Sequence, residues 1–448
     1  MVGYSDMLSV MQDASTATAN SMPFLRMVTD DKNADIMEET PKTVDACIDA
    51  LTKPLTEDEQ YKGEFSLPQQ PRILYSGSYE ECLAFLEGDL ERTAITVAPA
   101  EYTDGSPVAL PTEKAVARML EKTSHKPDEV VGLIGPAMYP ATVEAIAVNA
   151  VMAGCKPEYM PVLLAITEAM ANTDIAEALL GAGGWFSFGL VVNGPIAKEI
   201  NLNTGGPELS GPAPLTPGVP ANTTIGRFMR LVMINIGGIE PGFNEAKGTG
   251  NPHKTSIVLA EATDESPWPQ LSTDFGFQDG ENTVTLFVLW GDMLHGYRAQ
   301  YTGPESEEVI QRRLGPIAEA AKFLSRTQQG LVVMIRPQIA QILADAGYSR
   351  QDAKEWISKH SVDPFWKAQQ MGLGSGVVGT VFSVHGKPLN PTGNWPPEWK
   401  DPDFDPETSV QYYPEPFGIN IIVSVGTFYN GLIMNGTPRW TVAIDKWK

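Results

Sequence analysis

A group of acidic residues near the middle of the chain is the first place where the sequence could support chemistry. The run TSIVLAEA has the composition of a buried strand that ends near Glu261, and Asp264 and Glu265 follow it closely. In α/β sheets, ligands bind outside the carboxyl ends of strands, and neighbouring carboxylates can differ in pKa and serve as acid and base. Glu261, Asp264 and Glu265 are therefore candidate catalytic residues, although a solvated acidic loop explains the same pattern equally well.

The other end of this predicted strand carries His253 and Lys254, which are candidate ligand-binding residues. A fully extended strand of eight residues spans about 26 Å. His253 therefore cannot share one site with Glu261 unless the strand is short.

Two more segments place polar groups at predicted strand ends. VVNGP puts Asn193 where its amide could contact a ligand, but Asn-Gly is foremost a turn signal, and we favour the turn. GLIGPAMYPAT leads into a predicted helix that Thr142 caps, and free N–H groups there could bind an anion. That segment has neither the GxGxxG pattern nor the lysine of a phosphate-binding loop.

Cys155 is one of three cysteines and lies between two predicted apolar helices. The end of the first helix disfavours a thiolate, whereas Lys156 and the start of the second helix favour one. Because cysteine is among the most buried residue types, we interpret Cys155 as a packing residue that does not react.

The remaining residues give no metal or cofactor motif. The five histidines form no HxH, HxxxH or HExxH pattern, and the cysteines form no CxxC pair. The sequence therefore leaves both the metal content and the cofactor open.

Buried strands alternate with helices from about residue 71 to 335, which predicts an α/β fold with mixed or parallel sheets covered by helices. Strands are expected at 71–77 and 129–135, and a helix is expected to start at an Asn222 cap. We see no internal repeat in the sequence. The predicted segments are an irregular N-terminal arm (1–72), an α/β core (73–335) and a C-terminal part (336–448) with two helices, a Pro/Trp-rich excursion at 389–416 and closing strands.

The charge balance excludes two classes of partner. With 32 basic and 55 acidic residues, the chain has a formal charge of −23, which repels nucleic acid and anionic lipid. No basic, apolar leader and no membrane-spanning run is expected, and three scattered cysteines fit a reducing compartment. We therefore expect a cytoplasmic protein that binds neither nucleic acid nor membranes.

The order of several motifs resembles that of the large chains associated with UGSC proteins, whose small partner carries a Cys- or Sec-Gly-Ser-Cys motif. The similar segments span roughly residues 75–360 and are DGSPVALPTEKAVARML, ATVEAIAVNAVMAGCKPEYMPVLLAITEAM, VVNGPI, NTTIGRFMRLVMINIGG, HKTSIVLAEATDESPW and MIRPQIAQILADAGYS. The resemblance implies redox or sulfur-linked chemistry with a thiol partner protein, and implies little about the substrate. This chain departs from the family pattern because it has no Cys-Gly-Ser-Cys and because GNPHKT displaces His253 by two positions from the usual Gly-His-Pro-Gly-Lys loop.

Three functions remain open. The first is a cytoplasmic enzyme or enzyme subunit that acts on a small molecule, with redox or sulfur-linked chemistry and a Cys-Gly-Ser-Cys partner protein. The second is a cofactor-independent hydrolase or lyase that uses paired carboxylates, and the third is a non-catalytic scaffold subunit. We also expect a homo-oligomer, because the arm and the excursion carry aromatic residues such as Trp399, Tyr412 and Tyr413, and aromatics in irregular segments commonly anchor interfaces.

Overall fold

The structure is a computed structural model of the 448-residue chain. It describes residues 73–87, 102–172, 187–203, 221–239, 257–295, 307–324, 330–370, 383–385, 387–388, 397–401, 403–424 and 431–448. The predicted N-terminal arm, His253 and Lys254 lie outside these residues.

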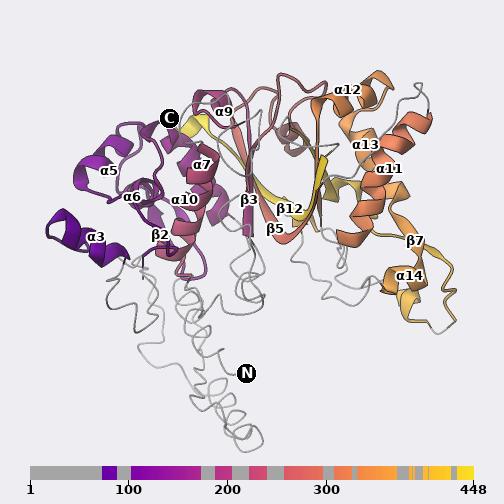
Figure 1. Ribbon diagram of the computed structural model, residues 1–448, viewed down its shortest axis with the longest axis horizontal. Coiled ribbons are helices and arrows are strands. Elements are labelled where there is room, and N and C mark those ends of the chain that lie inside the picture. Colours follow the sequence, from indigo (N-terminus) through magenta and orange to yellow (C-terminus); the bar gives the residue numbers. More distant parts are fainter. Residues whose placement is uncertain are drawn as a thin grey trace, which may run out of the picture.

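The centre of the fold is a six-stranded mixed sheet, which confirms the predicted α/β class. Its strand order is β11-β6-β12-β5-β3-β4. The strands are β3 (Ser187–Asn193), β4 (Val258–Ala260), β5 (Thr283–His295), β6 (Leu331–Ile335), β11 (Ile419–Val423) and β12 (Gly431–Ala443). The two long strands, β5 and β12, lie side by side in the middle and join the two sides of the molecule (Figure 1).

The sheet consists of two halves with the same strand pattern. In one half, β3 is parallel to β4 and antiparallel to β5. In the other half, β6 is parallel to β11 and antiparallel to β12. The halves meet where β5 and β12 pair antiparallel, which is the arrangement that a local two-fold axis between these strands would produce. This repeat is not visible in the sequence, because the halves share their topology but no motif.

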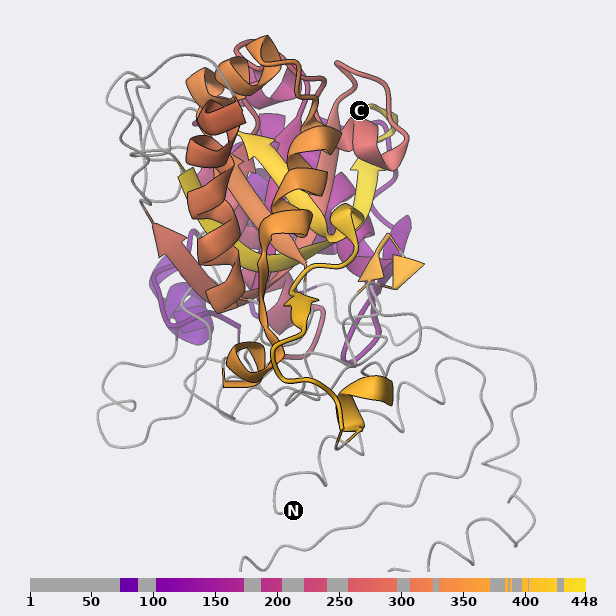
Figure 2. The same ribbon diagram turned by 90° about the vertical axis from the view of Figure 1, so that its right-hand side faces the viewer.

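Each half has its own layer of helices on the outer face of the sheet. Helices α6 (Val143–Ala153), α7 (Met160–Ala171) and α10 (Ala221–Asn235) share one apolar core with β3, β4 and β5. Helices α11 (Glu307–Leu324), α12 (Pro337–Asp345) and α13 (Arg350–His360) share a second core with β6 and β11. Figure 2 shows the second group of helices in front of the strands.

The inner face of the sheet forms a third core to which all six strands contribute. Alternate residues of the strands meet there, and the members are Val191, Ile257, Leu259, Leu271, Phe287, Leu289, Val332, Met334, Ile422, Leu432 and Met434. The sheet curls so far that its two edges meet. Ala262, just after β4, donates its backbone N–H to the carbonyl of Val423 at the end of β11, at 2.8 Å.

Smaller elements surround this framework. They are α3 (Tyr79–Glu87), α5 (Glu113–Leu120), β1 (Val130–Ile134), β2 (Tyr139–Thr142), α9 (Ile196–Glu199), β7 (Val362–Pro364), α14 (Phe365–Gln370), β8 (Ser383–Val384), β9 (Lys387–Pro388) and β10 (Ser409–Gln411), with short 3-10 turns η1 (Pro157–Tyr159), η2 (Leu271–Phe275), η3 (Pro397–Lys400), η4 (Pro416–Gly418) and η5 (Asp445–Trp447). None of the helices among the described residues combines the length and the hydrophobicity of a membrane-spanning segment.

Two local predictions were wrong, and a third was correct only in part. Residues 73–77 form no strand, and Ile73 and Tyr75 are exposed, so this short apolar run has no sheet neighbour. The strand at 129–135 exists as β1, but it pairs only with β2 in a separate hairpin, and Ile134 is its only buried residue. Helix α10 already includes Ala221, so Asn222 lies in its first turn and instead donates its side-chain amide to the carbonyl of Val258 in β4.

The C-terminal excursion packs on its own chain where the structure describes it. Tyr412 and Tyr413 are buried in the second core, and Trp399 packs on Phe365 with ring centroids 5.3 Å apart. Strand β10 joins β7 in a two-stranded sheet. These aromatic residues therefore stabilise the chain itself, which removes part of the sequence argument for an oligomer interface.

Candidate functional site

Glu261 occupies the point where the two edges of the sheet meet. It follows β4 directly, and its side chain points to the inner face because Ile257 and Leu259 alternate with it on that face. The side chain is fully buried. The predicted placement at a strand end is therefore correct, but the carboxylate faces the interior of the protein.

Four donors surround this carboxylate. Oε2 accepts hydrogen bonds from the Asn193 side-chain amide and the Leu271 backbone N–H, both at 2.5 Å. Oε1 accepts from the Arg350 guanidinium at 2.7 Å and from the Val423 backbone N–H at 3.4 Å. The carboxylate thus connects β3, η2, α13 and β11, and it stabilises the closure of the curled sheet.

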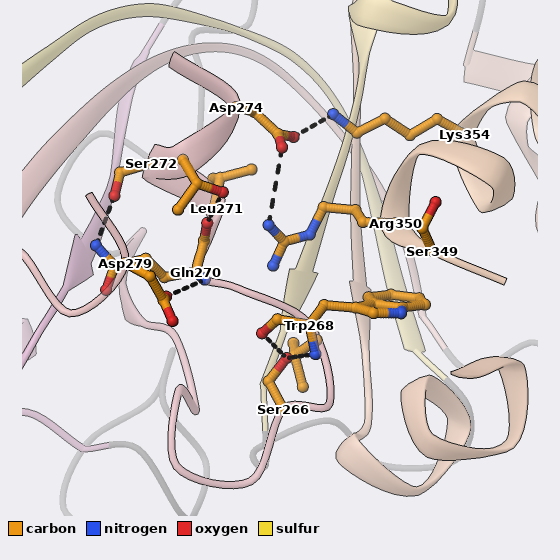
Figure 3. A network of polar contacts seen from close by, with 12 residues as sticks. Ser266, Trp268, Gln270, Leu271, Ser272, Asp274, Asp279, Ser349, Arg350 and Lys354 are labelled. Carbon is orange, nitrogen blue, oxygen red and sulfur yellow. Dashed lines mark hydrogen bonds and ion pairs between the residues drawn. The ribbon is translucent and has the colours of Figure 1, made fainter. Parts of the chain in front are cut away.

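Arg350 and Lys354, one turn apart on α13, bring two positive charges to the same place. Lys354 Nζ lies 2.5 Å from Asp274 Oδ2, and Arg350 Nη1 lies 4.0 Å from Asp274 Oδ1 (Figure 3). The Arg350 and Lys354 side chains are 6% and 5% exposed, whereas Asp274 is 29% exposed. We call Glu261, Arg350, Asp274 and Lys354 the charge cluster; it is electrically balanced and reaches solvent through Asp274.

Burial shifts two members of the charge cluster in opposite directions. Burial raises the pKa of Glu261, and the Arg350 charge and the N–H donors oppose this effect. Burial lowers the pKa of Lys354, and the Asp274 carboxylate opposes this effect. Shifts in these directions are common at catalytic sites, and buried ion pairs that only stabilise a fold show them too.

The structure brings Asn193 and Glu261 together and separates the other predicted site residues. Asp264 is exposed and forms an ion pair with Lys198, and Glu265 is exposed. The three carboxylates therefore do not form the expected shared pocket, because the chain turns outward directly after Ala262. Thr142 caps α6 as predicted, by accepting from the Ala145 N–H at 3.1 Å, and this contact accounts for its hydroxyl.

Cys155 is buried between the helices, as the sequence predicted, and lies in the first core. It follows Gly154, which ends α6 in the left-handed conformation at φ 81°. Burial raises the pKa of the Cys155 thiol to about 12, and the side chain of Thr224 opposes this only in part. The thiol also donates to the carbonyl of Thr224 at 3.4 Å.

Native Cys155 should resist alkylation. At pH 8 a thiol with a pKa of about 12 is ionised to roughly one part in ten thousand, and the thiolate is the reactive form. Cys155→Ala should cost about 1 kcal/mol of stability, as for the loss of a small buried group. Cys155→Ser should cost a similar amount, because the carbonyl of Thr224 can accept from the new hydroxyl. Mass spectrometry after iodoacetamide treatment checks this, with Cys82, which is partly exposed, as the internal comparison; rapid labelling at Cys155 would contradict it.

Arg350, Lys354 and Asp274 were missed by the sequence reasoning. The segment SRQDAKEWISKH looks like an ordinary solvated helix, and Arg350 lies 89 residues from Glu261 in the sequence. One signal was available: Arg350 and Lys354 have i, i+4 spacing and therefore share one face of the helix. Nothing local indicated that this face would be buried.

The described residues offer no metal site: no three His, Cys, Asp or Glu side chains among them are grouped as metal ligands. No protein-family model, curated protein or solved structure matches the chain.

Proposed function

We propose that this protein is an enzyme, or a subunit of one, that acts on a small molecule by proton transfer at the charge cluster. Lys354 and Asp274 would transfer the proton, and Glu261, held in place by Asn193, would fix the Arg350 guanidinium beside them. This corresponds to a cofactor-independent hydrolase or lyase, although the two carboxylates first expected beside Glu261 take no part.

The position of Lys354 carries this proposal: its side chain is 5% exposed, and its ammonium contacts Asp274, the member of the charge cluster that reaches solvent. Burial lowers the pKa of Lys354, a direction that is common among general bases at catalytic sites. Asp274 is 29% exposed, so the charge cluster is in contact with solvent.

Two unpartnered polar atoms beside Glu261 add support. Arg350 Nε and Asn193 Oδ1 are buried and have no hydrogen-bond partner in the described part of the protein. Buried polar atoms are almost always paired, so such atoms at one site suggest a partner that is not protein, such as water or a substrate.

The resemblance to the UGSC-associated chains supports a variant of this proposal. In that variant, a separate protein with a Cys-Gly-Ser-Cys motif supplies the redox thiols, because Cys155 is buried and its pKa is raised to about 12. We also propose a cytoplasmic setting, because the three scattered cysteines fit a reducing compartment, and self-association through the N-terminal arm, whose aromatic residues lie outside the described part of the chain. Copurification of a Cys-Gly-Ser-Cys protein would favour the thiol-linked variant.

Consumption of a metabolite by the purified protein tests the proposed enzyme. The full-length chain is incubated with a mixture of cellular small molecules, and mass spectrometry follows their depletion. The double variant Lys354→Met/Asp274→Asn should lose at least about 100-fold in rate, the usual size of an acid–base contribution. It removes one cation and one anion together, so no uncompensated charge remains buried.

The matched control is the double variant Lys322→Met/Asp363→Asn. Lys322 and Asp363 also form a buried ion pair, at 3.4 Å, but outside the charge cluster. Turnover should survive in the control. Equal turnover in wild type and in Lys354→Met/Asp274→Asn would contradict the proposal.

A scaffold function is the second candidate, and the four donors around Glu261 favour it. A carboxylate with two donors on each oxygen has no free lone pair for a substrate. A folded, well-ordered protein that depletes no compound in the same experiment would support the scaffold.

A further inference from the structure

A row of polar side chains crosses the inner face of the sheet beside Glu261. Asn193 at the end of β3 is the cross-strand partner of Thr283 on β5. Thr285, two residues further along β5, is the cross-strand partner of Thr441 on β12. We call Asn193, Thr283, Thr285 and Thr441 the polar row; all four residues are buried.

The polar row lies on the same face as the third apolar core. Val191 and Phe287 belong to that core. Each lies two residues from a member of the polar row on the same strand, so their side chains point to the same face of the sheet. Cross-strand partners have Cβ atoms about 4.5–5.5 Å apart, so the Asn193 and Thr283 side chains are neighbours.

Two oxygen atoms of the row have no protein partner among the described residues. These are Asn193 Oδ1 and Thr283 Oγ1, and both residues are completely buried. The orientation of the Asn193 amide is fixed, because its Nδ2 must face the Glu261 carboxylate as a donor. Asn193 Oδ1 therefore points away from Glu261 and needs a donor from elsewhere.

The other end of the row leads toward the surface. Thr285 Oγ1 lies 3.0 Å from Thr441 Oγ1, and Thr441 Oγ1 lies 3.0 Å from His385 Nε2. The His385 ring stacks on Phe275 with a centroid distance of 4.1 Å, and it is nearly parallel to Trp440, which is 36% exposed.

His385 is held there at the cost of backbone strain. Its φ of 47° lies in the left-handed region, which non-glycine residues rarely adopt and which occurs often at functional sites. Burial lowers the pKa of His385 to about 4, so the ring is neutral at pH 7. Because the neutral ring is hydrogen-bonded to Thr441, its NMR resonances can report on changes at the polar row.

We propose that the polar row is a substrate subsite that takes a neutral small molecule bearing hydroxyl or amide groups. One such group would donate to Asn193 Oδ1 and exchange a hydrogen bond with Thr283 Oγ1. The unpartnered atoms are an amide oxygen and a hydroxyl, so they select hydrogen-bond donors and not anions. The charge cluster nearby contains two cations and two carboxylates, so it gives no net preference for a charged ligand. The subsite rests on the proposed function only in that it places this molecule beside Glu261.

Binding of small probes to the full-length protein tests the subsite. The probes are acetamide, ethylene glycol, acetate and methylammonium at equal concentrations, and the readout is the ring resonances of His385 in histidine-labelled protein, assigned with the variant His385→Gln. We expect acetamide and ethylene glycol to shift these resonances saturably, and acetate and methylammonium to leave them unchanged. The subsite is overturned if no probe shifts them, or if the charged probes act as strongly as the neutral ones.

Thr283→Val provides the decisive variant, and Thr437→Val is its control. Thr437 is an equally buried β12 threonine whose hydroxyl already accepts from the Gly330 N–H at 3.2 Å. Thr283→Val should weaken the binding of the neutral probes about tenfold, as expected for the loss of one hydrogen bond. Thr437→Val should leave their binding unchanged. If Thr283→Val melts at a higher temperature than the wild type and binds the probes equally well, the Thr283 hydroxyl is only an unsatisfied buried group, and there is no subsite.

These outcomes are separate from those of the proposed function. Probe binding that requires Thr283, in a protein that turns over no metabolite, would keep the subsite and remove the enzyme. Turnover that requires Lys354, in a protein that binds none of the probes, would keep the enzyme and remove the subsite.

Discussion

The variant Glu261→Gln should lower the free energy of unfolding by about 3–5 kcal/mol, the usual cost of removing one partner of a buried ion pair. Arg350 would keep only the distant contact with Asp274 at 4.0 Å. The side-chain nitrogen that the substitution introduces is itself a hydrogen-bond donor. It would face two of the donors that now bind a carboxylate oxygen, so these contacts would be lost. Urea unfolding followed by circular dichroism measures the effect through the transition midpoint and slope.

The double variant Glu261→Gln/Arg350→Met separates charge from packing. It removes the cation that Glu261→Gln leaves uncompensated, so it should be more stable than Glu261→Gln alone. If Glu261→Gln unfolds at the wild-type urea concentration, Glu261 is not the residue that holds the sheet edges together. From the sequence alone, the same substitution is expected to abolish activity and to change stability little, because it keeps the shape of the side chain and removes only its charge. That expectation does not take the buried partner Arg350 into account.

Gly194→Ala should cost about 2–5 kcal/mol, from left-handed strain together with overpacking. Gly194 has a φ of 88°, and an added Cβ would lie 2.6 Å from Asn282 Oδ1 and 2.7 Å from the carbonyl of Glu281. The glycine also fixes the turn between Asn193 and α9, where the Ile196 N–H donates to Asn282 Oδ1 at 2.9 Å. Relieving the clash would therefore displace Asn193 from Glu261.

Gly276→Ala is the matched control for this substitution. Gly276 has a φ of 91°, but an added Cβ would meet nothing within 4 Å. Its cost should be the strain alone, about 1–2 kcal/mol. Equal unfolding midpoints for the two variants would show that the clash at Gly194 is relieved without loss of stability. The turn at Gly194 would then not be what positions Asn193.

The fold class could be predicted because it depends on local patterns. Apolar runs and Thr142 as a helix cap are written into short segments, and the structure confirms them. The strand pairing could not be predicted, since it depends on which surfaces meet after the chain has folded. Val130–Ile134 shows the limit: its composition predicts a strand but does not reveal whether the strand joins the main sheet or a separate hairpin.

The candidate site was predictable only in part, for the same reason. Strand-end logic identified Glu261 and Asn193, which lie next to each other at the ends of parallel strands. The same logic failed for Asp264 and Glu265, because sequence spacing does not show where the backbone turns outward. Arg350 and His385 reach the site from distant segments, so no local pattern marks them.

The position of β12 in the middle of the sheet has a consequence for synthesis of the chain. Thr285 on β5 and Thr441 on β12 are separated by 156 residues, although they are direct neighbours. At about 5–20 residues per second, a ribosome needs roughly 8–30 s to make the intervening segment. Throughout that interval β5 has an unpaired edge, which is a template for pairing with other chains. The nascent protein therefore passes through a long aggregation-prone stage, in which holding chaperones have time to act before the two halves join.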